Sequence, residues 1–162
     1  MVELGPPSGG LHDWADRLAI GRAMPSPVQV RVSVMPGEWA ITRMAPGDKI
    51  PESILRSSEF VSVTRTSDEL SIVCSESAIP AGQAVEKDWR LLRVHGPLPF
   101  HQVGVLASLA APLAEANISI FAVSTFETDY ILVKSSSLRL ACDALRSAGH
   151  ELIEPEQELP AP

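Results

Sequence analysis

FAVSTFETDYILV, residues 121–133, contains two apolar runs joined by a short polar turn, which is the pattern of a β-hairpin. VSVTRTSDELSIV, residues 61–73, follows the same pattern at an offset of 60 positions. A second echo, at an offset of 50, aligns WAITR (39–43) with WRLLR (89–93). Repetition of this kind indicates a duplicated structural unit of one strand, one helix and two further strands. A duplicated module of this size favours binding over catalysis.

The first copy begins with a strand in which every second residue is valine. Residues 28–34 (VQVRVSV) alternate valine with polar side chains, which predicts a strand with one apolar face. The sequence MPGE (35–38) then predicts a turn into a strand at 39–44, so residues 28–44 are expected to form a hairpin. The rest of this copy is expected to comprise a short helix at 51–57 and strands at 60–66 and 69–75.

The second copy is longer and more complete. It is expected to comprise a strand at 89–95, a helix at 103–116, strands at 118–124 and 128–134, a helix after Ser135–Ser137, and an edge strand at 151–153. Pro112 lies inside the first of these helices and predicts a kink or an early break. Asn117 is suited to end that helix, and the hydroxyls of residues 135–137 are suited to cap the next one.

These elements predict an α+β fold of two ferredoxin-like units, each βαββαβ, with antiparallel sheets and helices on one face. The expected domains are a flexible extension at 1–27, a first unit with a short helix at 28–86, a second unit at 87–153 and a disordered acidic tail at 154–162. Within the extension, a short helical stripe is expected to act as a docking contact; it consists of Leu11, Trp14 and Leu18.

Composition excludes several classes of partner. The chain has 162 residues and a net charge of −7 without a run of Lys or Arg, so neither nucleic acid nor an anionic membrane is expected to bind. No stretch has the length or hydropathy of a secretory signal or a membrane span, which predicts a cytoplasmic protein. Cys74 and Cys142 are expected to be buried thiols, and neither a metal site nor a cofactor is expected.

Three stretches together resemble a known family: residues 96–152 (GPLPFHQVG through AGHEL), VSVTRTSDELSIVC (61–74) and MPGEWAITR (35–43). They are similar to the tandem ACT-domain proteins, the type that includes the CASTOR arginine sensors and the regulatory half of aspartate kinases. The resemblance covers roughly residues 28–153, and STFETDYILV (124–133) is its most specific part. It implies reversible binding of a small ligand, usually an amino acid, at the junction of two ACT units.

Asp129 is the first candidate binding residue. It shares the apolar phase of its strand with Ile131 and Val133, and a carboxylate on an apolar face requires a partner. From the residues alone, that partner could be Arg93, Arg139, a backbone amide or a ligand. The family resemblance favours the ligand, because the matching aspartate contacts the bound amino acid in the arginine sensors.

Two loops are expected to complete the binding site. The start of the helix at about 103 offers backbone N–H groups for a ligand carboxylate, and Gly104 would allow a close approach to the main chain. The end of the strand at 124 offers hydroxyl and ring contacts, and two of its residues carry over from the family motif. The candidate ligand-binding residues are Phe100, Val103, Gly104, Val105, Ser124, Thr125, Phe126 and Asp129.

Two other functions remain open from the sequence. His101, Ser124 and Asp129 could form a nucleophilic triad, although the chain has no G-x-S-x-G, P-loop or H-E-x-x-H motif. The protein could also be a dimerisation module with an empty site. Residues 118–124 are apolar in both phases, which predicts a sheet covered on both faces and a homodimer as the preferred state. The downstream protein target cannot be read from the residues.

Overall fold

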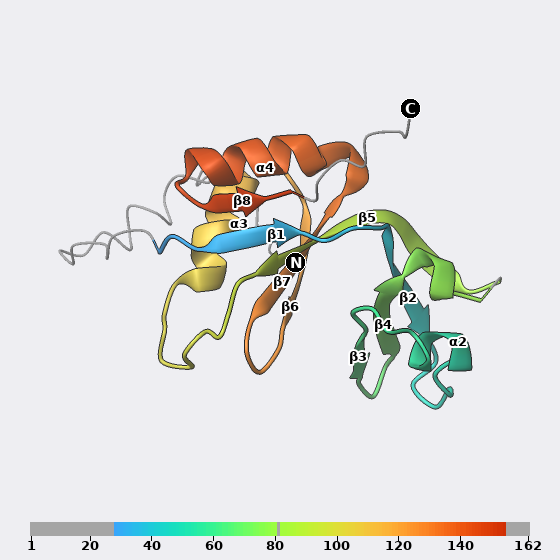
Figure 1. The fold of residues 1–162 in the computed structure, drawn as a ribbon. Helices are drawn as coiled ribbons and strands as arrows, with labels where there is room; N and C mark the ends of the chain where they lie inside the picture. The colour runs from blue at the N-terminus through green and yellow to red at the C-terminus, as the bar shows by residue number, and fades with distance from the viewer. Residues whose placement is uncertain (1–27, 81, 155–162) are drawn as a thin grey trace, which may run out of the picture.

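The computed structural model describes residues 28–80 and 82–154, which form an α+β fold (Figure 1). The first part of the chain contains β1 (Arg31–Val34), β2 (Trp39–Met44), α2 (Glu52–Leu55), β3 (Ser62–Arg65), β4 (Leu70–Ser75) and the 3-10 turn η1 (Glu76–Ala78). The second part contains β5 (Ala84–Val94), α3 (Val105–Glu115), β6 (Ile120–Ser124), β7 (Asp129–Lys134), η2 (Ser135–Ser137), α4 (Leu138–Ser147) and β8 (Glu151–Ile153). Every strand and helix expected within these residues is present; β5 begins at Ala84 and not at Trp89, and the other ends differ by a few residues.

The long strand β5 joins the two parts of the fold. Its beginning pairs with β2, from Ala84 opposite Arg43 to Trp89 opposite Trp39, and the register shifts by one residue between Ile41 and Trp39. Its second half pairs with β7 on one side and with β1 on the other. All eight strands therefore belong to one connected sheet, in the order β3-β4-β2-β5-β1-β8, with the β6–β7 hairpin attached to β5. Figure 1 shows α2 with β2–β4 at one end of β5, and α3 and α4 at the other.

The expected hairpin of residues 28–44 is wrong. β1 pairs with β5 and β8, whereas β2 pairs with β4 and β5. After β1 the chain instead continues beside β5, where the Met35 N–H donates to the Leu91 carbonyl at 2.8 Å. The pairing of β1 with β8 is parallel, so the expectation of purely antiparallel sheets is also wrong at this edge. Alternation identified a strand, but it carries no information about which strand lies beside it.

Helices cover one face of the sheet in each part of the fold. α3 and α4 pack over β1, β5 and β7, with Leu109, Leu113 and Leu145 against Leu92 and Ile131. In the first part, Ile54 of α2 packs on the β4 residues Leu70, Ile72 and Cys74. The alternate residues of each strand point to the opposite, helix-free face.

The two helix-free faces share a third apolar cluster. It joins β2 and β4 of the first part to β5 and β7 of the second, through Trp39, Val73, Trp89, Leu91 and Leu132. Phe121 and Val123 of β6 pack against this cluster. Phe121 and Val123 are therefore partly buried against the chain's own first part, which weakens the sheet-based reason to expect a homodimer.

The ends of the helices agree only in part with the ends expected from the sequence. Asn117 has a φ of +57°, the left-handed conformation expected after α3. The early break expected at Pro112 is wrong, because α3 continues to Glu115. The expected serine cap is also wrong: residues 135–137 form η2, and Ser137 at the start of α4 makes no side-chain capping hydrogen bond.

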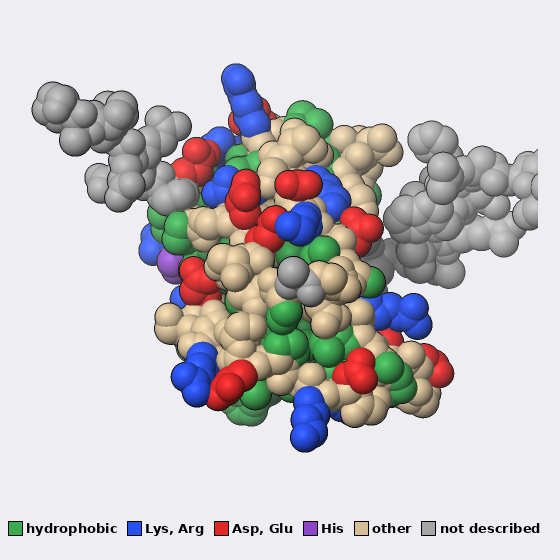
Figure 2. Space-filling view, turned by 90° about the vertical axis from the view of Figure 1, so that its right-hand side faces the viewer, with side chains coloured by type: hydrophobic (Ala, Val, Ile, Leu, Met, Phe, Trp, Pro, Cys, Tyr) green, Lys and Arg blue, Asp and Glu red, His purple; other side chains and the backbone are tan. Residues whose placement is uncertain are grey.

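Several expectations concern other surfaces and the chain ends. Cys74 and Cys142 are buried free thiols, as expected. None of the helices in the described part of the chain has the length and hydropathy to cross a membrane. On the face seen in Figure 2, basic and acidic side chains are interspersed. The stripe of Leu11, Trp14 and Leu18 and residues 155–162 lie outside the described residues.

Candidate functional site

The loop after β5 and the turn between β6 and β7 enclose a hollow of about 200 Å³. Five of the candidate residues line it together: Phe100, Ser124, Thr125, Phe126 and Asp129. The remaining lining residues are Leu98, Pro99, Glu127 and Thr128. Two segments, 98–100 and 124–129, thus share one surface, because β5 and β7 are neighbours in the sheet.

The β6–β7 turn is held rigidly at the end of the sheet. The Thr125 N–H and hydroxyl both donate to the Thr128 carbonyl, each at 2.8 Å. The buried Thr128 hydroxyl donates to the carbonyl of Val94 at 2.6 Å, which ties the turn to β5. Gly96 allows the loop to pass closely, since a Cβ there would lie 2.6 Å from the Glu127 carbonyl oxygen. One wall of the hollow is therefore fixed before any ligand binds.

Asp129 lies at the start of β7 with its carboxylate half-buried. The Ser124 hydroxyl donates to Asp129 Oδ1 at 2.5 Å, across a directly opposed pair of the β6–β7 hairpin. Neither Arg93 nor Arg139 forms an ion pair with Asp129 in the structure, so the two arginine alternatives are wrong. A neutral hydroxyl satisfies one acceptor of the carboxylate but does not compensate its charge. Among the described residues, the negative charge of Asp129 has no cationic partner.

Three candidate residues do not line the hollow. Gly104 precedes α3 with a φ of +88°, a left-handed conformation that accounts for glycine at this position. Val105, the first residue of α3, is buried in the core, whereas Val103 is 77% exposed. These three residues lead into α3 and are separated from Phe100 of the hollow by residues 101–102.

The aromatic rim of the hollow faces solvent. Phe100 and Phe126 are each 79% exposed, and their rings meet edge to face with centroids 5.0 Å apart. Exposed large apolar side chains that gather at one place are typical of a surface that another molecule covers.

The alternative catalytic triad is not assembled. Ser124 donates its hydroxyl to Asp129, and His101 makes no hydrogen bond to either residue in the structure. His101 also does not line the hollow. The arrangement therefore lacks the nucleophile-to-base contact that this chemistry requires.

A second hollow was not foreseen from the sequence. It measures about 350 Å³ and lies where β3 and β4 approach β6. Its lining is rich in hydroxyls: Ser62, Thr64, Ser71 and Ser124. Only the folding of the first part over the second brings these strands together, so no local pattern could have indicated it.

The sequence is similar to known protein families over most of the described residues. An ACT-domain family model matches residues 84–147, and a family model for an N-terminal domain matches residues 37–82. The human protein CASTOR3P is 27% identical over 143 residues, which cover 68% of this chain and 88% of that protein. The chain is an ACT-domain protein, similar to proteins of the CASTOR type. The human cytosolic arginine sensor for mTORC1 subunit 1 is 39% identical over 59 residues, 36% of this chain. That match spans only 18% of the arginine sensor.

Two solved structures have folds similar to that of this ACT-domain protein. A structure from Agrobacterium tumefaciens is 35% identical with a TM-score of 0.76, and covers 83% of this chain and 99% of that one. The regulatory subunit of aspartate kinase from Thermus thermophilus has a TM-score of 0.55 at 10% identity, covering 75% of this chain and 99% of that one. The latter likeness concerns the fold alone, and it confirms the α+β, ferredoxin-like class.

Proposed function

We propose that this ACT-domain protein is a regulatory, non-enzymatic amino-acid-binding protein of the cytoplasm. Its ligand is held at the Ser124–Asp129 hollow, at the junction of two ACT units. The carboxylate of Asp129, accessible and without a cationic partner among the described residues, is the observation that carries this proposal. An α-ammonium or a guanidinium would supply the missing positive charge. The arginine sensor among the relatives supports the class of ligand.

The carboxylate of the amino acid requires donors. The first turn of α3 supplies unpaired backbone N–H groups, because Gly104 makes no side-chain capping bond and no acidic residue occupies that turn. The ligand would contact only the main chain of residues 103–105. This agrees with the burial of the Val105 side chain and with the absence of a side chain at Gly104. Thr125 has its hydroxyl committed to the turn, so its role is to fix the site.

A second ACT unit is expected to close the hollow. Phe100 and Phe126 leave an apolar rim in solvent, and a hollow of about 200 Å³ is below the usual volume of a complete ligand site. A homodimer that covers this rim would bury the aromatic pair and exclude water from the Asp129 charge. The protein would then pass its ligand state to a protein target of unknown identity.

The competing function is a dimerisation module that binds no ligand. The exposed aromatic rim favours this function as much as it favours the ligand-binding function. A thermal-shift screen of wild type, Asp129→Asn and Asp68→Asn against the 20 protein amino acids separates the two. Asp68 is an exposed turn residue, so its amidation removes an equal charge away from the hollow. At 100 times its Kd, a ligand should stabilise the wild type by about 2.7 kcal/mol.

The screen has a decisive pattern for each function. Under the proposal, at least one amino acid stabilises wild type and Asp68→Asn equally, and Asp129→Asn abolishes its effect. The melting temperature of ligand-free Asp129→Asn should remain close to that of wild type, since no buried cation loses its partner. If no amino acid stabilises wild type, the protein is a dimerisation module. If Asp129→Asn responds like wild type, the ligand lies elsewhere.

A further inference from the structure

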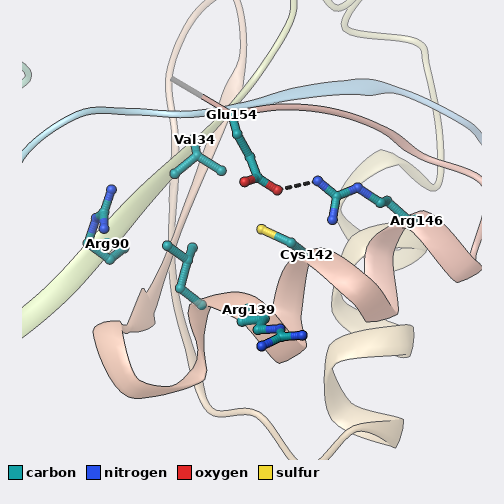
Figure 3. A pocket seen from close by; sticks show the side chains of 7 residues that line it. Val34, Arg90, Arg139, Cys142, Arg146 and Glu154 are labelled. Atoms are coloured by element: carbon teal, nitrogen blue, oxygen red, sulfur yellow. Dashed lines mark hydrogen bonds and ion pairs between the residues drawn. The ribbon is translucent and has the colours of Figure 1, made fainter. Parts of the chain in front are cut away.

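A separate cavity of about 340 Å³ lies beside α4, between this helix and the strands β1 and β5. Figure 3 shows its walls, which come from four parts of the chain. Val34 comes from β1 and Arg90 from β5; Leu138, Arg139, Cys142 and Arg146 come from α4; and Glu154 follows β8. None of these residues lines the Ser124–Asp129 hollow. The volume is within the range of sites that bind small metabolites.

The charge of this cavity is opposite to that of the chain. Three guanidinium groups and one carboxylate line it, in a protein whose net charge is −7. Glu154 forms an ion pair with Arg146, as Figure 3 shows. Arg90 and Arg139 have no ion pair among the described residues. The cavity thus contains two guanidinium groups that no acidic side chain in this part of the chain compensates.

Arg90 is the more informative of the two. Its Nε is buried and has no hydrogen-bond partner within the described residues. Its Nη2 makes one long hydrogen bond, 3.5 Å, to the Met35 carbonyl. A buried N–H donor of a cationic group is costly when it is left unpaired, so this arrangement favours an acceptor that the described chain itself does not provide.

The remaining wall of the cavity is apolar. Val34, Leu138 and the thiol of Cys142 contribute it, and burial raises the pKa of the Cys142 thiol, which keeps that group neutral. We infer that the Arg90–Arg139 cavity is a second binding site, for a small anion that carries a carboxylate or phosphate group beside a compact apolar group. Arg90 binds the anionic group, and Arg139 adds a second positive charge on another side of the cavity (Figure 3). Val34 and Leu138 contact the apolar group, and Glu154 competes with the anion for the guanidinium groups.

The test uses NMR of the whole chain with three probes: acetate, isovalerate and inorganic phosphate. Each is titrated at constant ionic strength against chloride, and the Nε–Hε signal of Arg90 is followed, assigned by its loss in Arg90→Lys. The expected result is a saturable shift of this signal, with isovalerate binding more tightly than acetate because of its isobutyl group. The comparison of isovalerate with phosphate identifies which anionic group the site prefers.

Three variants test the assignment of roles. Arg139→Gln should weaken binding of the tightest probe by roughly threefold, because the cavity loses one of its positive charges. Glu154→Gln should strengthen binding, because it removes the competing carboxylate. Arg56→Gln removes an equal charge from an exposed residue at the end of α2 and should leave the affinity unchanged.

Other outcomes would overturn the inference. A signal of Arg90 that fails to shift with any probe, or that shifts linearly and equally with chloride, means that the cavity binds no specific anion. An equal loss of affinity in Arg56→Gln and Arg139→Gln means that the anions respond to overall charge alone. Unchanged affinity in both Arg139→Gln and Glu154→Gln places the anion outside this cavity.

Discussion

His150 donates from Nε2 to the carbonyl of Ser108, with 3.1 Å between the two heavy atoms. In an unbroken helix, the N–H four residues later would bond this carbonyl, but that residue is Pro112, which has none. The Val30 N–H donates to the other ring nitrogen, Nδ1, which fixes the tautomer. His150 is buried and replaces the hydrogen bond that the proline removes.

Replacing His150 should destabilise the fold. His150→Ala leaves the Ser108 carbonyl and the Val30 N–H without partners at a buried site, which should lower the free energy of unfolding by about 3 kcal/mol. Urea denaturation measures this loss. His101→Ala, at an exposed loop position, should change stability by less than about 0.5 kcal/mol. In the double variant with Pro112→Ala, the new N–H can bond Ser108, so part of the loss should be recovered; additive effects would contradict this account.

Alkaline pH should destabilise the protein through Cys74. Burial raises the pKa of this thiol to about 11, whereas in the unfolded chain it ionises near pH 8.5. The thiol is protonated in both states below that pH, so its contribution is complete there. It is lost as the pH rises from about 8.5 to 11, because only the unfolded state releases its proton. The difference in unfolding free energy between wild type and Cys74→Ala should therefore fall by roughly 3 kcal/mol across this window. A constant difference would be inconsistent with a buried, protonated thiol.

Phe60 should stabilise the contact between the two parts of the fold. Its ring lies between Trp39, at 6.0 Å edge to face, and Tyr130 of β7, at 4.2 Å. Phe60→Ala removes both aromatic contacts and should lower the free energy of unfolding by about 2–3 kcal/mol, measured in urea. Leu55→Ala truncates an apolar side chain that is 63% exposed on α2 and should have little effect. Equal effects of the two changes would argue against Phe60 as a bridge.

Self-association should depend on the aromatic rim of the hollow. Phe100→Ser combined with Phe126→Ser should weaken dimerisation at least about tenfold in sedimentation velocity, because exposed aromatic side chains dominate many interfaces. The matched control, Leu140→Ser, changes an apolar side chain that is 54% exposed on α4 and should leave association unchanged. A wild type that is monomeric at all concentrations, or a dimer insensitive to the double change, would contradict the proposed closure.

The sequence predicted the secondary structure well because its signals are local. Alternating valines in β1, the turn residues of the β6–β7 hairpin and Asn117 after α3 each act within a few residues. The same signals failed for strand pairing. β1 lies beside β8, 120 positions away, because both strands bury apolar side chains under α3 and α4.

The candidate site, too, was predicted only in part from the sequence. The sequence identified Asp129 as a carboxylate that needs a partner, and the resemblance identified the surrounding turn. Only the tertiary structure showed that Ser124 bonds Asp129 and that Phe100 and Phe126 meet above it. The Arg90–Arg139 cavity had no sequence signal, because its residues lie on β1, β5, α4 and the segment after β8.

The sequence alone therefore determined which residues form strands and helices, and it carried the resemblance to the ACT-domain proteins. The tertiary structure decided that β5 joins the two parts of one eight-stranded sheet, that the helix-free faces share an apolar cluster, and that His150 compensates Pro112. The reason is physical: backbone conformation and amphipathic periodicity depend on neighbours in the chain, whereas the partner of a buried polar group depends on which distant segments share its core.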